Sequence, residues 1–347
     1  MISGELKQAF LVLVRLGLGH NEAFPFKLID WKSILSLAFQ QGLSAIVLDG
    51  INQLPLEQRP SKEVLLEWIG QTIYQSNQYK RQWEVANRLA DWWSEQNISA
   101  TIIKGRSIAK YYPAPEHRYS CDLDVFVEHD WERACKLIEE HGVPLVYEVY
   151  KEVEFTLDEV YVECHRYITP VRGNKHLKEF ERYLRSLLDN EPKEYFEGTT
   201  LVCPPLMFTV MLYIEHALGD LLHGHLTLKH IVDWVVLRKQ DFNCDIFIYR
   251  CKEFKFDKFL SLIDAFADVV EGKLEYNDLP PLYKKEFDEI FKPPVAKRPH
   301  SWFGRRVDMF FDIIKNGKKF HDYGYTSMPS FLFHGVWAHF FDKEVRL

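Results

Sequence analysis

The chain has 347 residues, of which 47 % are apolar and 27 % are charged; this is the composition of a folded globular protein and excludes general disorder. Its net charge of −7 argues against a broad nucleic-acid-binding surface, because such surfaces carry an excess of Lys and Arg. No apolar run reaches the length of a membrane span, and the 6 cysteines show no Cys-x-x-Cys spacing. We therefore expect a cytoplasmic protein with reduced thiols.

The first 96 residues are predicted to form an N-terminal helical region. Apolar residues recur there at helical spacing, and Gly and Pro residues mark the breaks. The predicted helices span residues 5–19, 31–41, 43–54 and 61–96. The last of these carries a set of aromatic residues spaced so that most can share one face, namely Trp68, Tyr74, Trp83, Trp92 and Trp93. We expect this face to support a sheet formed by the next part of the chain.

Residues 97–170 are predicted to form a small catalytic core with a mixed sheet. The pattern changes at residue 98 from helical spacing to short apolar runs. The predicted strands span residues 98–103, 122–127, 143–149, 152–157 and 160–167, with helices over 105–111 and 130–141. The last two strands read as a hairpin that turns at Asp158 and Glu159. Strands mixed with helices in this way predict an α+β unit.

Residues 171–347 are predicted to form a helical C-terminal domain. Its predicted helices span residues 175–188, 207–219, 226–239 and 245–270, the last with a break, and a short strand is expected at 199–202. Residues 302–341 are rich in aromatic side chains and predict a pair of docking helices. The whole chain is therefore expected to be α+β, with a small mixed-sheet core flanked by N-terminal helices and a helical C-terminal domain.

Two carboxylates at the start of a predicted strand are the first sign of chemistry. Side chains of a strand alternate between its faces, so Asp122 and Asp124 point to one side while Leu123 points to the other. Two such carboxylates repel each other unless a cation lies between them, and oxygen ligands of this kind suit Mg²⁺. Gly105 follows an apolar run and opens a short helix, so backbone N–H groups there can approach an anion. A solvated strand end beside a turn is the alternative interpretation.

Several short motifs around these carboxylates carry a family resemblance. They are Lys104-Gly105, Tyr112-Pro113, Arg118, Asp122-Leu123-Asp124 with an apolar tail, and Glu163 followed by His165. Over residues 98 to 168 the chain resembles the polymerase-β-like nucleotidyltransferase superfamily, and in particular a family of bacterial nucleotidyltransferases. Two features depart from the superfamily pattern: Lys104-Gly105-Arg106-Ser107 replaces the more usual Gly-Ser turn, and Glu163 stands where Asp is more usual.

The resemblance implies a metal-dependent enzyme that moves a nucleotidyl group from an NTP such as ATP to an unidentified acceptor, which could be a small molecule, a peptide or a protein. It implies that Asp122, Asp124 and Glu163 are the catalytic residues and hold Mg²⁺ or Mn²⁺. The nucleotide-binding residues are expected to be Lys104, Gly105, Ser107 and Arg118, with the two cations neutralising triphosphate charge. The alternatives are an inactive nucleotide-binding or interaction module on the same fold, and a phosphoryl-transfer or phosphodiesterase variant.

The histidines allow more than one interpretation. His216, His223 and His230 recur every seven residues, which on one helix would place them on one face and allow a metal cluster. We expect Gly219 and Gly224 to break that helix, which favours histidines with structural partners at an interface. A third interpretation is that His223 or His230 faces the substrate. Arg106 and Lys110 are expected at exposed helix positions, and His165 is expected either to orient a ligand or to have a structural role.

Overall fold

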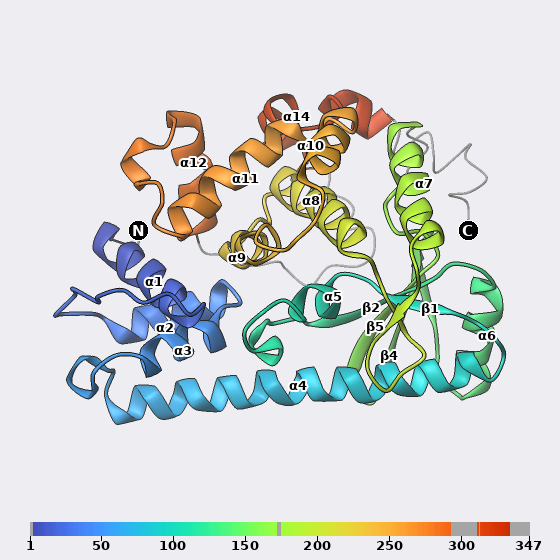
Figure 1. Ribbon diagram of the computed structural model, residues 1–347, viewed down its shortest axis with the longest axis horizontal. Coiled ribbons are helices and arrows are strands. Elements are labelled where there is room, and N and C mark those ends of the chain that lie inside the picture. The colour runs from blue at the N-terminus through green and yellow to red at the C-terminus, as the bar shows by residue number, and fades with distance from the viewer. Residues whose placement is uncertain (1–2, 172–174, 293–310, 312, 334–347) are drawn as a thin grey trace.

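The computed structural model describes residues 3–171, 175–292, 311 and 313–333 (Figure 1). The chain has the expected α+β fold, in which a seven-stranded mixed sheet is packed among helices. The strands are β1 (Ala100–Ile102), β2 (Asp122–Val127), β3 (Val146–Val149), β4 (Glu152–Leu157), β5 (Val160–His165), β6 (Glu194–Tyr195) and β7 (Val202–Cys203). Their order across the sheet is β3-β4-β5-β2-β1-β7-β6, so the strand predicted at 199–202 lies slightly later and joins the same sheet.

The centre of the sheet is formed by β2 and β5, which run parallel with Asp124 opposite Glu163. The predicted hairpin of β4 and β5 is confirmed, and its two turn residues, Asp158 and Glu159, have φ values of 48° and 64°. Positive φ at both positions is the backbone of the tight turn that best fits two twisted strands. This turn fixes the register of the hairpin, so that Glu152 lies opposite His165.

The two faces of the sheet have different chemistry because side chains alternate along each strand. One face is apolar, with Leu123, Val125 and Val162 in a core closed by α4 (Lys62–Ser94) and α6 (Trp131–Glu140). The opposite face carries the acidic residues of β2, β4 and β5 and lies toward α8 (Leu206–His223) and α9 (Leu228–Leu237), as Figure 1 shows. The sheet is thus a wall with a hydrophobic side and a charged side.

Helix α4 connects the N-terminal helices with the sheet. Its 33 residues correspond to about 50 Å, and it runs from the N-terminal helices to the far edge of the sheet (Figure 1). Trp68 near one end is fully buried and donates to Ser44 O at 2.8 Å, while Trp93 at the other end is fully buried and donates to Ala134 O at 3.3 Å. Tyr74 is 63 % exposed, so the predicted aromatic face is only partly buried.

The N-terminal helices are α1 (Gly4–Gly17), α2 (Trp31–Gln40) and α3 (Ser44–Asn52), followed by the short η1 (Leu56–Gln58). Helices α1 and α3 cross with their backbones in close contact. A Cβ atom on Gly50 would lie 2.1 Å from the carbonyl oxygen of Leu13, so only glycine fits at this crossing.

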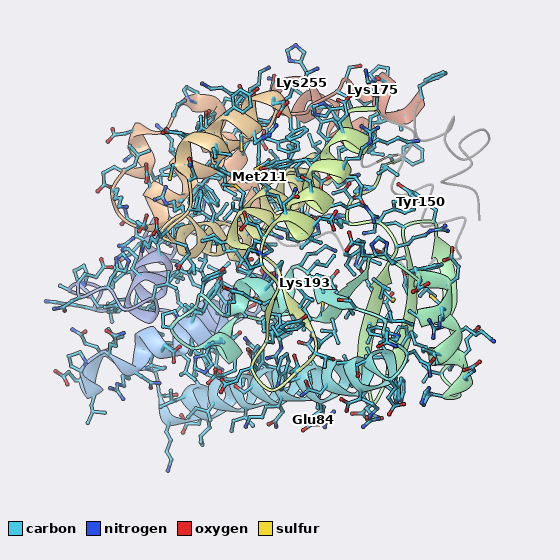
Figure 2. All side chains as sticks on the ribbon, turned by 45° about the vertical axis from the view of Figure 1, so that its right-hand side comes forward. Glu84, Tyr150, Lys175, Lys193, Met211 and Lys255 are labelled. Carbon is cyan, nitrogen blue, oxygen red and sulfur yellow. The ribbon has the colours of Figure 1, made fainter. Side chains whose placement is uncertain are left out.

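The remaining helices complete the fold around a large shared core. They are α5 (Gly105–Ala109), η2 (Pro115–His117), α7 (Lys175–Asn190), α10 (Cys244–Glu253), α11 (Asp257–Val270), η3 (Tyr276–Asp278), α12 (Pro281–Ile290) and α14 (Gly317–Asp322). Phe10 and Leu13 of α1 lie in one hydrophobic core with Met211 of α8 and Phe266 of α11 (Met211 is labelled in Figure 2). N-terminal and C-terminal helices therefore share a core, and the division into three domains at residues 96 and 170 stays a prediction.

Helix α8 differs from its predicted end. It continues through Gly219 to His223 and ends at Gly224, which has φ +78° and caps the helix in a left-handed conformation. A glycine inside a buried helix costs only about 1 kcal/mol, which the surrounding core outweighs. Of the predicted helix pair at 302–341, residues 302–310, 312 and 334–341 lie outside the described residues, and the described part contains the short helix α14. Among the helices of the described ranges, none is long and apolar enough to cross a membrane.

Candidate active site

The parallel pairing of β2 with β5 places the predicted carboxylates in one cavity. Asp124 is directly opposite Glu163, and Asp122 lies two residues earlier on the same face of β2. All three line a cavity of about 270 Å³, which we call the carboxylate cavity. Its opposite wall comes from α8 and α9, where His216, Lys229, His230 and Asp233 are among the lining residues. The predicted nucleotide-binding residues Lys104, Gly105, Ser107 and Arg118 also line it.

Asp124 is neutralised by the protein itself. Lys104 Nζ donates to Asp124 Oδ1 at 2.6 Å and lies 4.0 Å from Glu163 Oε2. Burial lowers the pKa of Lys104, but the charges of Asp124 and Glu163 outweigh this and raise it above its usual value. Burial likewise raises the pKa of Asp124, and the adjacent Lys104 and His165 more than reverse this, so it falls well below its usual range. Asp124 therefore already has cationic partners without a metal, which offset its repulsion by the neighbouring carboxylates.

Asp122 lies in a different electrostatic environment. It accepts a 3.3 Å hydrogen bond from Ser120 Oγ, and none of the ion pairs in the described part of the chain includes it. Burial, followed by the negative charges of Asp124 and Glu163, raises the pKa of Asp122 above its usual value. Asp122 is consequently the carboxylate of the cavity whose charged form has most to gain from an additional cation.

The turn between β1 and α5 holds Lys104 in an unusual backbone conformation, with φ 55° and ψ −132°. Its carbonyl oxygen accepts hydrogen bonds from Ser107 N at 2.8 Å and from Ser107 Oγ at 2.7 Å. The Ser107 residue is 1 % exposed, and its predicted contact with phosphate stays a prediction. A non-glycine residue in such a conformation costs about 1–3 kcal/mol. Glycine would adopt this conformation at a lower free-energy cost than lysine does.

His165 lies between two carboxylates and is fully buried. Its Nε2 is 2.9 Å from Asp124 Oδ1, and its Nδ1 is 2.9 Å from Glu152 Oε2. Burial and the nearby lysines lower the pKa of His165, and the adjacent carboxylates of Asp124 and Glu152 outweigh them and raise it to about 9. At neutral pH the ring therefore carries a positive charge and holds Asp124 in place. Lys151 Nζ lies 2.7 Å from Glu152 Oε2, and neither Lys151 nor Glu152 was predicted as a site residue.

Arg118 forms a buried ion pair with Asp233. Its Nε and Nη2 donate to the two oxygens of Asp233 on α9 at 2.7 and 2.8 Å, and its Nη1 donates to Gly105 O at 2.9 Å. The hydroxyl group of Tyr112, in the Tyr-Pro motif, donates a hydrogen bond to the same carboxylate at 2.5 Å. Burial raises the pKa of Asp233, but Arg118 and Lys229 outweigh it and lower the pKa to about 2. This network joins the glycine turn to α9.

The histidines of α8 and α9 do not form the metal cluster that their spacing allows. His216 and His230 line the carboxylate cavity, and His230 Nε2 lies 3.0 Å from Asp220 Oδ2. His223 Nδ1 lies 2.7 Å from Gly219 O, and its ring contacts Phe331 instead. Of the described residues, one group of three has ligand atoms within 4.8 Å of one another, namely Asp124, Glu163 and His165.

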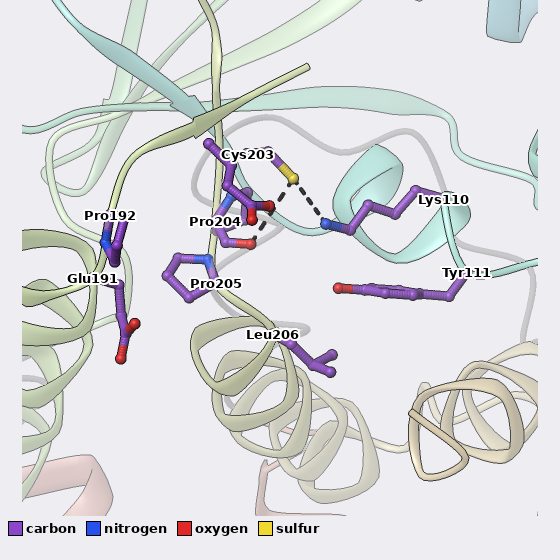
Figure 3. A pocket seen from close by; sticks show the side chains of 9 residues that line it. Lys110, Tyr111, Glu191, Pro192, Cys203, Pro204, Pro205 and Leu206 are labelled. Atoms are coloured by element: carbon purple, nitrogen blue, oxygen red, sulfur yellow. Dashed lines mark hydrogen bonds between the residues drawn. The ribbon is translucent and has the colours of Figure 1, made fainter. Parts of the chain in front are cut away.

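A second cavity of about 410 Å³ lies at the far end of α5 and contains none of the predicted carboxylates (Figure 3). Lys110 donates to Cys203 Sγ at 2.8 Å in its wall, as the dashed line in Figure 3 shows. Arg106 lies over the rings of Tyr79 and Trp83, with its guanidinium carbon 3.7 and 4.3 Å from the ring centroids. The expectation of exposed positions for Arg106 and Lys110 is therefore wrong, because both stems are packed against neighbours.

The donor set of the carboxylate cavity fits a divalent ion. Asp122, Asp124 and Glu163 supply the oxygen ligands that Mg²⁺ and Mn²⁺ take, and they lie beside a turn that can face an anion. His165 is held as a cation by two carboxylates, so its nitrogen becomes a ligand only after losing a proton. The oxygen atoms of Asp124 and Glu163 are therefore the better fit, and Asp122 lies outside the group whose ligand atoms are within 4.8 Å of one another.

A family model described as an uncharacterised nucleotidyltransferase matches residues 27–270. The match begins before α2 and ends with α11, so it includes the sheet, the carboxylate cavity and both helices of its opposite wall. No curated protein and no solved structure matches the chain.

Proposed function

The chain belongs to this nucleotidyltransferase family, and we propose that it transfers a nucleotidyl group from an NTP such as ATP to an acceptor with the help of Mg²⁺ or Mn²⁺. The observation that carries the proposal is the register of β2 and β5. It brings Glu163 of β5 beside Asp122 and Asp124 of β2, on one side of the sheet and in one cavity. Such a carboxylate set has a clear use in phosphoryl chemistry and none in forming a core.

The carboxylates have separable roles in this proposal. Asp122 binds the ion, because it forms no ion pair with another described residue and burial raises its pKa. Asp124 is fixed by Lys104 and His165 and offers its remaining oxygen. Glu163, whose side chain is 19 % exposed, faces the cavity and either shares the ion or accepts the proton of an acceptor hydroxyl. A bound divalent ion would stabilise the charge that develops on the α-phosphate and on the leaving pyrophosphate.

The cations of the cavity suggest where the triphosphate lies. Arg118 donates to Asp233 and Gly105, so we propose that it positions the glycine turn and does not itself bind phosphate. Lys229 lines the same cavity and is 3.7 Å from Asp233 Oδ2. Burial and the adjacent Arg118 lower the pKa of Lys229, so an anionic ligand would restore its preference for the charged form. Lys229 is therefore our candidate for phosphate binding, together with the Gly105 turn.

Labelled ATP tests the proposal directly. The protein is incubated with Mg²⁺ and ATP labelled at either the α- or the γ-phosphate, with candidate small molecules, peptides and proteins as acceptors. Nucleotidyl transfer moves the α-label to the acceptor and releases the γ-label in pyrophosphate. The double variant Asp122→Asn/Asp124→Asn serves as the control and should transfer neither label. If every acceptor stays unlabelled and the ATP stays intact with the wild-type protein, the proposal is contradicted.

An inactive nucleotide-binding module is the second candidate, and one observation favours it. Lys104 and His165 already neutralise Asp124, so this carboxylate needs no metal to be stable. In this case Mg²⁺-ATP would raise the melting temperature, and neither label would move. A phosphoryl-transfer or phosphodiesterase variant would instead move the γ-label or hydrolyse a diester.

A further inference from the structure

The ammonium group of Lys104 lies next to two carboxylates, in the kind of position that a metal ion has in a metal site. Its ammonium is 2.6 Å from an oxygen of Asp124 on β2 and 4.0 Å from an oxygen of Glu163 on β5. These two carboxylates are neighbours across parallel strands. In two-metal sites the ions lie about 3.5–4 Å apart and stabilise the attacking and the leaving oxygen. The ammonium of Lys104 therefore lies between two carboxylates that a second ion would need.

We infer that Lys104 is a built-in replacement for one of the two divalent ions, so that the carboxylate cavity takes a single Mg²⁺ or Mn²⁺. The inference rests on the proposed function for the identity of the bound nucleotide. The single ion binds at Asp122, the carboxylate without an ion-pair partner among the described residues. The Lys104 ammonium neutralises the Asp124 and Glu163 side of the cavity together with His165, whose Nε2 lies 3.4 Å from Glu163 Oε2.

The backbone at Lys104 supports a specific role for its side chain. The residue has φ 55° and ψ −132°, a conformation that glycine adopts at lower cost. Two hydrogen bonds from Ser107 fix its carbonyl oxygen, which aims the side chain from the start of α5 back toward β2 and β5. The side chain is only 14 % exposed. A long, flexible lysine would ordinarily extend into solvent, and this one is held inside.

The other lysines of the cavity do not have this position. Lys151 pairs with Glu152 at 2.7 Å, and Lys229 lies 3.7 Å from Asp233. Both carry the same charge as Lys104 and line the same cavity, but neither forms an ion pair with Asp124 or Glu163 among the described contacts. Lys151 is consequently a matched control, because its removal takes the same charge from the cavity and leaves the proposed ion position untouched.

Metal stoichiometry tests the inference without an activity measurement. Mn²⁺ is titrated into the protein at saturating α,β-methylene-ATP, which cannot release pyrophosphate, and bound Mn²⁺ and nucleotide per chain are measured by equilibrium dialysis and by the electron paramagnetic resonance of free Mn²⁺. We expect one Mn²⁺ per chain in the wild-type protein and two in Lys104→Met. Methionine keeps the Cβ, and with it the backbone cost, while removing the charge. Lys104→Arg and Lys151→Met should each stay at one, and circular dichroism and melting curves verify that every variant is folded.

The possible outcomes are distinct. Two Mn²⁺ in the wild-type protein, or one in folded Lys104→Met, would overturn the inference. A Lys104→Met variant that binds one ion more tightly would show that Lys104 only competes with the metal, and would also overturn it. No Mn²⁺ in either protein would remove both the inference and the metal dependence of the proposed function. If the stoichiometry changes from one to two while the α-label is never transferred, the inference stands and the proposed function fails.

Discussion

Arg118 and Asp233 form a two-point ion pair in the interior of the protein, with Nε to Oδ1 at 2.7 Å and Nη2 to Oδ2 at 2.8 Å. Their side chains are only 4 % and 1 % exposed. The pair links the loop that precedes β2 with α9, and so fixes the distance between the two walls of the carboxylate cavity. Because water cannot replace either partner, each charge depends on the other.

Asp233→Asn should strongly destabilise the protein. The substitution leaves the buried guanidinium of Arg118 without its counter-ion, and breaking such a pair from one side costs about 3–5 kcal/mol. Urea denaturation at pH 7 measures the loss in the free energy of unfolding. Asp268→Asn is the control, since Asp268 is 40 % exposed in its ion pair with Arg238 and its loss should cost less than about 1 kcal/mol. Equal effects of the two substitutions would contradict the assignment of a buried pair.

Asp122→Asn and Asp124→Asn should change the apo protein in opposite directions at pH 7. Asp124→Asn leaves Lys104 and His165 without the carboxylate between them, at a cost of about 1–3 kcal/mol. Asp122→Asn removes a buried charge that burial, Asp124 and Glu163 disfavour, so its free energy of unfolding should be unchanged or higher. Chemical denaturation of both variants without metal decides the matter. A stable Asp124→Asn protein would show that the ion pair contributes nothing.

The same two variants should lose the response to ligand. Binding to the native state alone adds RT ln(1 + [L]/Kd), or about 2.7 kcal/mol at a hundredfold excess over Kd. Millimolar Mg²⁺-ATP should therefore raise the melting temperature of the wild-type protein and leave that of Asp122→Asn nearly unchanged. Asp158→Asn, in the exposed hairpin turn, should respond like the wild-type protein. An unshifted wild-type melt would count against nucleotide binding.

Some of the contacts in the carboxylate cavity can be predicted from the sequence. The turn at Asp158 and Glu159 was predicted, and counting outward from it pairs Glu152 with His165, so Glu152 could have been found as a site residue. Strand parity also placed Asp122 and Asp124 on one face. By contrast, the parallel pairing of β2 with β5 joins segments separated by a helix and a hairpin, and no local pattern fixes such a register. It is this pairing that brings Glu163 to Asp124.

Other features depended on the three-dimensional contacts of single side chains. Lys104 and Arg118 were both predicted to bind phosphate because cations near acidic ligands commonly do so. The anion that Lys104 contacts depends on the backbone angles of Lys104, and the anion that Arg118 contacts depends on the position of α9. The spacing of residues in the sequence predicts neither of these. The predicted helix break at Gly219 failed for a related reason, since the buried environment of α8 outweighs the weak helical preference of glycine.

Glu271 should give the protein a stability that is lost in acid. Burial raises the pKa of this residue, but hydrogen bonds from Lys239, Arg238 and Lys273 outweigh burial and lower it to about 2. The value in an unfolded chain is about 4.3, so the stabilisation is complete above that pH and disappears as the pH falls toward 2. Its lysine partners are partly exposed, so the contribution is about 1–2 kcal/mol after screening.

Denaturation of Glu271→Gln and of the wild-type protein at pH 7 and pH 3 measures this contribution. The difference in the free energy of unfolding should be smaller at pH 3. The exposed Glu275 provides a control, because Glu275→Gln should differ little from the wild-type protein at either pH. A difference for Glu271→Gln that does not depend on pH would show that packing, and not charge, is responsible.

Two glycines inside helices should respond in opposite ways to alanine. Gly70 lies on the exposed side of α4, and a Cβ there would meet no atom within 4 Å. Gly70→Ala should therefore stabilise the protein by about 0.5–1 kcal/mol, because alanine favours the helix. Gly50→Ala would put a Cβ 2.1 Å from the carbonyl oxygen of Leu13 and force α1 and α3 apart. Thermal melts of the two single variants should move in opposite directions, and a stable Gly50→Ala would disprove the close crossing.

The core shared by the first and the later helices has a consequence for how the protein is made. Phe10 and Leu13 are synthesised some 250 residues before Phe266, which lies in the same core. At about 5–20 residues per second the first helices wait roughly 10–50 s for their partners. During that time the apolar side chains of α1 that contact α11 lack this part of their core. Synthesis from the N-terminus to the C-terminus therefore cannot complete this core until α11 has been made.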